Sequence, residues 1–329
     1  MPRYHIERLE KDDLTIVKRL VQVYEYKPYR YFPGLRNKEL SDFVTEELYA
    51  YLQCPESHFA YLAKEGKTAV GLAVLRLLPW DKRIFGKEMA TMDYLIAIGN
   101  YQERIGVLNG LLSRLFNLCV ELKIEHLSVR IDTGDLPSMH ALEGTGFKSM
   151  DTVVSYCFDF AKSSIEELKY PFRIRSHRED DVESILALSR LSFKDYIDRF
   201  HSDPTLDNRN CDELYVEWAR NSCLGLVADR VTVAENDKAI LGFATSKFHE
   251  KVNRFTDHKI GEIVLVCVSP NVRGRGVYTS FIHEGLCWFN KKVDFVQVVT
   301  QINNIFVQRA WSNVGFWLIG SRSTFHKWF

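Results

Sequence analysis

The sequence has no net charge, no long apolar run and no paired cysteine motif. Its 329 residues include 43 Lys plus Arg and 43 Asp plus Glu. No overall field therefore attracts a polyanion, and we do not expect a nucleic-acid partner. The longest unbroken apolar run, 263–268, is far shorter than the ~18 residues of a membrane-spanning helix. We therefore expect no membrane partner.

Signals for secretion and for metal binding are missing as well. Arg3, Glu7 and Arg8 interrupt the apolar core that a secretion signal needs. The seven cysteines form no C-x-x-C pair, and the ten histidines lack ligand spacing to one another or to cysteine. We predict reduced thiols, no metal site and a cytoplasmic location.

The sequence does contain an internal repeat. Its length favours about two domains of ~150 residues. The pair Gly146-Phe147 recurs 169 residues later as Gly315-Phe316, and other landmarks recur at offsets of 168 to 171 residues. This spacing predicts tandem copies of one unit. We place the domains at 1–165 and 166–329.

Each copy shows the same order of expected elements. In the second copy we predict helices over 180–191, 277–290 and 304–313, strands over 262–268 and 295–300, and a hairpin turn at Asn236-Asp237. Apolar strands that alternate with helices favour an α/β (α+β) fold. We expect a mixed, mostly antiparallel sheet with helices on both faces in each unit.

The most informative segment joins strand 262–268 to the next helix. It contains Arg273, Gly274, Arg275 and Gly276. The glycines let the backbone curl so that successive amides point inward, and the helix start adds its dipole. The segment predicts an anion site suited to a pyrophosphate, and an ordinary strand-to-helix turn is the alternative.

In combination, V-x-V-x-P, R-x-x-G, Asn304 and Gly315-Phe316 resemble the GNAT superfamily of acetyl-CoA-dependent N-acyltransferases. The resemblance covers 260–316 and implies acetyl-CoA as the cofactor. Tyr278 stands where the family usually has a small residue, so its side chain must point away from the phosphates. The residues that the resemblance places at CoA are Val266, Cys267, Val268, Arg273, Gly274, Arg275, Gly276, Val277, Tyr278, Asn304 and Trp311.

The first copy matches this pattern only in outline. Arg104 lies at the position of Arg273, but Val107 replaces Gly276 and Asp135 replaces Asn304. A β-branched residue hinders the glycine-type curl, and a carboxylate is unfavourable near an anionic cofactor. We predict a degenerate N-terminal GNAT-like domain that binds no acetyl-CoA.

Three further segments narrow the resemblance. "LPWDKRIFGKEMATM", "RFHSDPTLDNRNCDELYVEWARNS" and "STFHKWF", in a tandem layout, look like the TDP-fucosamine acetyltransferase group. That group acetylates the amine of a nucleotide-linked 4-amino-6-deoxy sugar. The resemblance implies a small-molecule amine acceptor of this kind.

Transfer to an amine needs a proton acceptor, donors for the oxyanion and a fate for the thiolate. Glu262 occupies the position of the general base in histone-type relatives, and the Val266 amide would stabilise the oxyanion. Relatives place a tyrosine, the general acid, where this chain has Trp311, whose indole cannot act as an acid. The candidates for the acid are Tyr278, Tyr215 and His326, although the thiolate could also leave unprotonated. His326 could equally be the base.

Several side chains are candidates for binding the acceptor. An aromatic ring can stack on a sugar or base, and a carboxylate can hold a hydroxyl or an amine. Trp218, with Leu214 at helical spacing, fits packing at least as well. The candidates are His201, Asp203, Tyr215, Trp218, Asn221, Trp80 and Asp81.

Two other functions stay open. The first is acyl transfer to another amine, such as a peptide N-terminus or a small metabolite. The second is a non-catalytic CoA-binding regulatory protein, in which Trp311 reflects lost catalysis. The sequence also leaves open whether the chain forms a homodimer.

Overall fold

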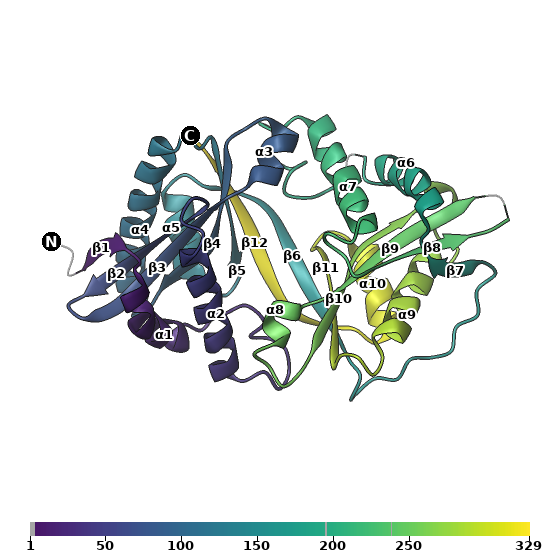
Figure 1. The fold of residues 1–329 in the computed structure, drawn as a ribbon, viewed down its shortest axis with the longest axis horizontal. Coiled ribbons are helices and arrows are strands. Elements are labelled where there is room, and N and C mark those ends of the chain that lie inside the picture. The colour runs from purple at the N-terminus through teal and green to yellow at the C-terminus, as the bar shows by residue number, and fades with distance from the viewer. Residues whose placement is uncertain (1–3, 195, 238) are drawn as a thin grey trace. The chain divides into compact units, whose positions relative to one another are not determined.

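The computed structural model describes residues 4–194, 196–237 and 239–329. The chain divides into two compact units, one of residues 1–152 with 321–329 and the other of residues 153–320. Figure 1 shows strands and helices in both units. None of the described helices is long and apolar enough to span a membrane.

The first unit contains a sheet in the order β1-β2-β3-β4-β5-β12. Only β4 and β5 are parallel, and the other neighbours pair antiparallel. The strands are β1 (His5–Arg8), β2 (His58–Glu65), β3 (Thr68–Leu77), β4 (Met89–Ala97), β5 (His126–Asp132) and the end of β12 (Trp317–Trp328). The helices are η1 (Lys11–Asp13), α1 (Leu14–Val23), α2 (Asn37–Leu52), α3 (Pro79–Phe85), α4 (Tyr101–Glu121) and α5 (Leu136–Gly144).

The second unit repeats this plan, with the sheet order β7-β8-β9-β10-β11-β6. Again only the fourth and fifth strands, β10 and β11, are parallel. The strands are β7 (Arg173–Ser176), β8 (Arg230–Glu235), β9 (Ile240–Phe248), β10 (Ile260–Val268), β11 (Phe295–Gln301) and the later part of β6 (Lys148–Asp159). The helices are η2 (Glu179–Asp181), α6 (Val182–Ser192), α7 (Asn208–Cys223), α8 (Glu250–Asn253), η3 (Pro270–Val272), α9 (Val277–Phe289) and α10 (Ile305–Val314).

The predicted α/β architecture and the hairpin are confirmed, but the expected boundary near residue 165 differs from the division in the structure. The chain passes from the first unit to the second within β6, after Thr152, and returns within β12, before Ser321. Residues 153–159 pair with β11, and residues 322–328 pair with β5. Each unit is therefore completed by the last strand of the other half of the sequence.

Apolar packing positions α9 against β10. Ile263 of β10 contacts Ile282, Leu286 and Phe289 of α9 in one buried cluster. Burial of each such side chain contributes about 1.5–3 kcal/mol. Gly285 lies against Ile263, where a Cβ would collide with the isoleucine side chain. This close approach fixes where α9 starts relative to β10.

Candidate active site

The central feature of the second unit is a fork between β10 and β11. The two strands pair only over Ile260–Glu262 and Phe295–Gln297, and their described residues show no pairing beyond that point. We call the space between the diverging ends the fork. On its other side β10 pairs with β9 over 261–263 and again over 266–268, with a shift of register between Ile263 and Val266.

The backbone of β10 presents alternate residues to the fork. The amide of Ser269 donates to Leu241 O at 2.9 Å, so Ser269 and Cys267 bond toward β9. Because successive residues of a strand point their amides to opposite sides, Val266 and Val268 direct theirs toward the fork. This is the arrangement that an extended amide-containing arm of a ligand could pair with.

Cys267 contributes no free group to this edge. Its thiol approaches Leu188 O at 3.6 Å, on the face covered by α6. Burial raises the pKa of this thiol to about 12, so it stays protonated and unreactive. The predicted role of Cys267 at the cofactor stays a prediction, with only its backbone near the fork.

A glycine loop leads from β10 into α9. Gly274 and Gly276 have φ angles of +76° and +81°, and a Cβ at either position would meet nothing within 4 Å. Gly276 is the N-cap of α9, and no described side chain caps the helix start. Arg273 and Arg275 are exposed beside it. The first-turn amides of α9 and two guanidinium groups are therefore available to an anion.

Polar groups at the end of β11 face the same fork. Asn304, the N-cap of α10, donates from Nδ2 to Thr300 Oγ1 at 3.0 Å and to Tyr196 Oη at 3.5 Å. The Tyr196 hydroxyl donates to Gln301 Oε1 at 3.0 Å. Sequence reasoning missed Tyr196, because it lies just before the segment that starts at Arg199 and nothing in the sequence links it to Asn304.

Tyr278 and Trp311 belong to the apolar core of the second unit. Trp311 is 3% exposed, and the Tyr278 ring packs against the same apolar cluster. The ring of Tyr278 therefore packs on the apolar core, and its predicted orientation away from the phosphates stays a prediction. Burial raises the pKa of Tyr278 far above its ordinary value, so the phenol is protonated at neutral pH.

Glu262 sits at the base of the fork in an ion-paired cluster. Its Oε2 lies 2.9 Å from His249 Nε2 and 3.2 Å from Lys247 Nζ. Burial alone would raise the pKa of this carboxyl, but the contacts with His249 and Lys247 outweigh it and lower the pKa to about 2. Such a carboxylate is a weak base, so this geometry disfavours the predicted general-base role.

The comparisons with known proteins agree with this site. Residues 190–316 match the family model described as acetyltransferase (GNAT) family. This part of the chain, less than half of it, is therefore similar to GNAT acetyltransferases. The match spans the fork, the glycine loop and Asn304. No curated protein matches the sequence.

Solved structures place the fold among tandem GNAT proteins. A GCN5-related N-acetyltransferase from Sphaerobacter thermophilus has a TM-score of 0.67 at 12% identity, covering 100% of this chain and 96% of that one. A tandem GNAT protein from the clavulanic acid biosynthesis pathway has a TM-score of 0.59 at 14% identity, covering 99% and 98%. A glucosamine N-acetyltransferase region of a fungal multi-domain GH3 β-N-acetylglucosaminidase has a TM-score of 0.67 at 15% identity, covering 98% and 38%. Identities this low establish the fold alone.

Two of the predicted acceptor residues, His201 before α7 and Tyr215 within it, belong to an internal network of the second unit. His201 lies 3.2 Å from Asp198 and 3.0 Å from Asp212. Burial would lower the pKa of His201, but the two carboxylates outweigh it and raise the pKa. Tyr215 donates to the other oxygen of Asp198. These buried groups hold one another, and Tyr215 cannot serve as an acid for the thioester in this arrangement.

The other acceptor candidates in that segment are Asp203, Trp218 and Asn221. Asp203 is 2% exposed and accepts from the Thr205 amide at 3.0 Å. Trp218 stacks on Tyr215 with ring centroids 6.1 Å apart, and Asn221 is half-buried. Their packing fits a structural role, and acceptor binding by these residues stays a prediction.

Three candidates belong to the first unit. Trp80 and Asp81 lie in α3, where Asp81 is 5% exposed. His326 lies in the part of β12 that pairs with β5, and its ring is 4.4 Å from that of His126. His326 is 1% exposed. The roles predicted for these residues in acceptor binding and catalysis stay predictions.

In the first unit the residues equivalent to the cofactor site bind one another. Arg104 forms an ion pair with Asp135, the N-cap of α5, and Tyr24 donates to Asp135 at 2.9 Å. The helix α4 begins before Arg104, and Asn100 caps it by accepting from the Glu103 amide at 3.0 Å. The arginine and the helix start are thus both engaged internally.

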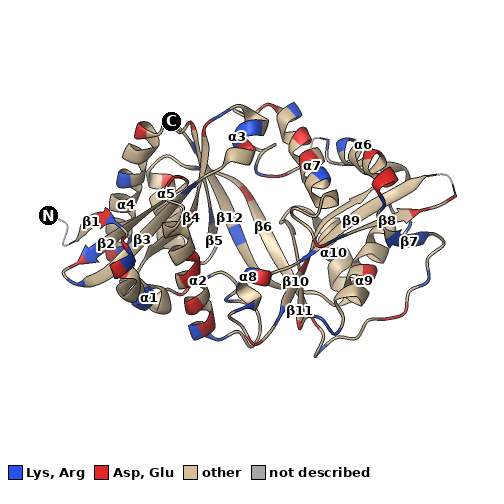
Figure 2. Cartoon of the chain, in the orientation of Figure 1, with Lys and Arg blue, Asp and Glu red and all other residues tan. Residues whose placement is uncertain are grey.

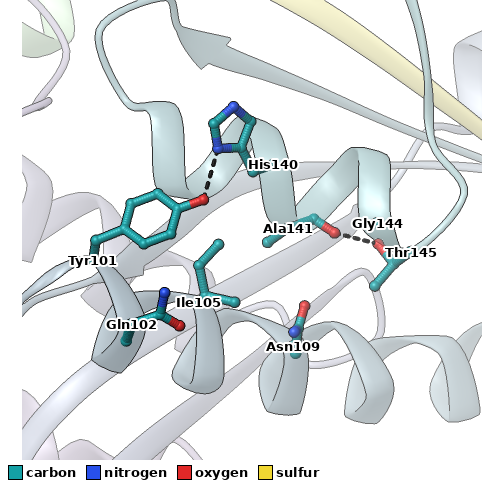
Figure 3. Close-up of a pocket in the computed structure, with 8 residues that line it drawn as sticks. All are labelled: Tyr101, Gln102, Ile105, Asn109, His140, Ala141, Gly144 and Thr145. Atoms are coloured by element: carbon teal, nitrogen blue, oxygen red, sulfur yellow. Dashed lines mark hydrogen bonds between the residues drawn. The ribbon is translucent and has the colours of Figure 1, made fainter.

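A shallow groove of about 400 Å³ lies between α4 and α5 of this unit (Figure 3). Tyr101 and His140 form one side, with the phenol 2.8 Å from Nδ1. No Lys or Arg lines the groove, so it offers no cationic side chain to a pyrophosphate. The groove therefore does not provide the anion site that the glycine loop offers in the second unit.

Proposed function

We propose that the protein is an acetyl-CoA-dependent N-acetyltransferase whose GNAT domain holds the cofactor in the fork. The observation that carries this proposal is the junction of β10 and α9. There the fork-facing edge of Val266 and Val268 continues into a glycine loop and an uncapped helix start. An anion at α9 joined to an extended amide-containing arm along β10 has the chemistry of a CoA chain.

In this proposal, different groups of the domain would bind different parts of the cofactor. The amides of Gly276 and the first turn of α9, with Arg273 and Arg275, would hold the pyrophosphate. The fork-facing edge of β10 would bind the arm, and the Val266 amide would donate to the oxyanion. The bound cofactor supplies an activated acetyl thioester.

The acceptor in this proposal is a small-molecule amine, and we favour a nucleotide-linked amino sugar. The sequence resemblance supports it, and one structural neighbour is described as a glucosamine N-acetyltransferase region. Lys and Arg are interspersed with Asp and Glu in both units (Figure 2). That distribution and the zero net charge argue against a polyanionic acceptor.

A non-catalytic CoA-binding protein is the second candidate. Two observations favour it: Trp311 is buried where relatives resembling this chain have a tyrosine, and Glu262 is held as an ion-paired carboxylate with a pKa of about 2. Binding would then occur without turnover.

One experiment separates the two functions. The full chain is incubated with acetyl-CoA and a panel of amines that includes nucleotide-linked amino sugars, amino acids and peptides, and free thiol is followed. We expect turnover with at least one amine. Arg273→Glu should abolish it, while Arg19→Glu, the same charge change at an exposed position of α1, should not. Tight CoA binding without turnover on any amine would contradict the enzymatic proposal.

A further inference from the structure

Tyr196 is a phenol at the fork that the proposed chemistry has not yet used. It lies after α6, yet its hydroxyl contacts Gln301 at the end of β11 and Asn304 at the start of α10. Ser192 at the end of α6 donates to Val268 O at 3.4 Å. The segment after α6 therefore contacts both arms of the fork.

The Tyr196 ring is held in place by aromatic packing. Its centroid lies 5.5 Å from that of Phe193 and 5.6 Å from that of Tyr215. Tyr215 is itself fixed by its hydrogen bond to Asp198, which also holds His201. The hydrogen bonds around His201 thus hold Tyr215, and Tyr215 packs against the Tyr196 ring.

A thiolate that leaves from a thioester in the fork needs a nearby proton donor. The Trp311 indole is no acid near neutral pH, and the Tyr278 ring packs on the apolar cluster. The Tyr196 hydroxyl lies among polar groups, with one donated and one accepted hydrogen bond. The proton that Tyr196 donates to Gln301 can be redirected by rotation of the hydroxyl about its C–O bond.

We propose that Tyr196 is the catalytic residue that protonates the departing CoA thiolate, an inference that rests on the proposed function. The amine nitrogen bonds to the carbonyl carbon, the carbon–sulfur bond breaks, and the sulfur takes the phenol proton. The phenolate then regains a proton, directly or through water, from the ammonium centre formed by the attack. The products are the N-acetyl amine and free thiol.

The first unit offers a matched control. Tyr24, at the end of α1, contacts Asp135, the N-cap of α5, as Tyr196 contacts Asn304, the N-cap of α10. The fold therefore places a phenol at this point in both units. Tyr24→Phe removes the same kind of contact where no cofactor site is proposed.

The test compares acetyl-CoA with acetyl-seleno-CoA, using the amine with the fastest turnover in the panel. A selenol is a much stronger acid than a thiol, so selenolate leaves without a proton. General acids contribute roughly 10²–10⁴-fold, and thiolate is a fair leaving group. We therefore expect Tyr196→Phe to lower kcat with acetyl-CoA by about 100-fold and to leave kcat with the seleno donor close to wild type. Tyr24→Phe should change neither.

Other outcomes would overturn the inference in distinguishable ways. Equal losses with both donors would assign Tyr196 a structural role, and unchanged kcat with acetyl-CoA would remove it from the reaction. A donor-specific loss in Tyr278→Phe with none in Tyr196→Phe would transfer the role to Tyr278. Absence of wild-type turnover on every amine would overturn the proposed function, and the role of Tyr196 with it.

Discussion

Gly276→Ala should weaken CoA binding far more than it weakens the fold. Gly276 has a φ of +81°, and a Cβ there would meet nothing within 4 Å. The substitution therefore costs only the backbone preference, about 1–2 kcal/mol if the loop keeps its shape. If the residue instead relaxes to negative φ, the amide at the start of α9 turns away from the anion.

The affinity for CoA falls if residue 276 relaxes to negative φ and its amide no longer points at the anion. A hydrogen bond to a charged group contributes about 1.5–3 kcal/mol, so losing one such bond raises Kd for CoA by about 10- to 100-fold. Isothermal titration calorimetry with CoA measures the affinity, and thermal unfolding without ligand measures the stability.

Gly225→Ala is the control for this experiment. Gly225 has a φ of +72° with nothing within 4 Å of a Cβ, and it follows α7, outside the loop. Both variants should show similar losses of stability. Equal losses of CoA affinity in the two variants, or no loss in either, would refute the anion site at α9.

Three further predictions follow from the ion pairs and the strand exchange. Asp135→Asn should lower the free energy of unfolding in urea by about 3–5 kcal/mol, because it removes the charge of buried Asp135 that pairs with half-buried Arg104, while CoA stoichiometry stays at one per chain. Separate fragments 1–165 and 166–329 should aggregate, because each lacks the last strand of its sheet; soluble fragments with native circular dichroism would contradict this. The pKa of Glu262 is about 2 in the folded protein and about 4.3 in the unfolded chain. The ionised carboxylate therefore stabilises the fold by about 3 kcal/mol above about pH 4. This contribution is lost as the pH falls toward 2. Urea titrations of wild type and Glu262→Gln should therefore converge in acid, and kcat/KM of the variant should keep its acidic limb if this carboxylate is not the base.

Local sequence patterns were enough to predict the repeat, the sheet and the loop. The apolar periodicity of 277–290 matches the observed helix within one residue, because one face of α9 packs on β10. Gly274 and Gly276 were identified because only glycine adopts their backbone conformation without cost. These features depend on neighbours in the sequence.

The features that sequence reasoning missed depend on distant partners. The exchange of β6 and β12 follows from strand pairing between residues far apart, which leaves no mark in local propensity. The low pKa of Glu262 comes from His249, the N-cap of α8, and from Lys247 of the adjacent strand β9. Tyr196 contacts Asn304, which lies 108 residues further along the chain.

The equivalent helices of the two units, α4 and α9, begin at different positions relative to their equivalent arginines, and the contacts of the arginines differ accordingly. In the first unit α4 begins before Arg104, so the guanidinium projects from the first turn of the helix and pairs with Asp135. In the second unit α9 begins after Arg273, and the preceding glycines leave that guanidinium in solvent. The same residue is thus an internal ion-pair partner in one copy and a free donor in the other. Because that difference is local, the chain can concentrate its affinity for an anion at one helix start while its overall charge stays at zero.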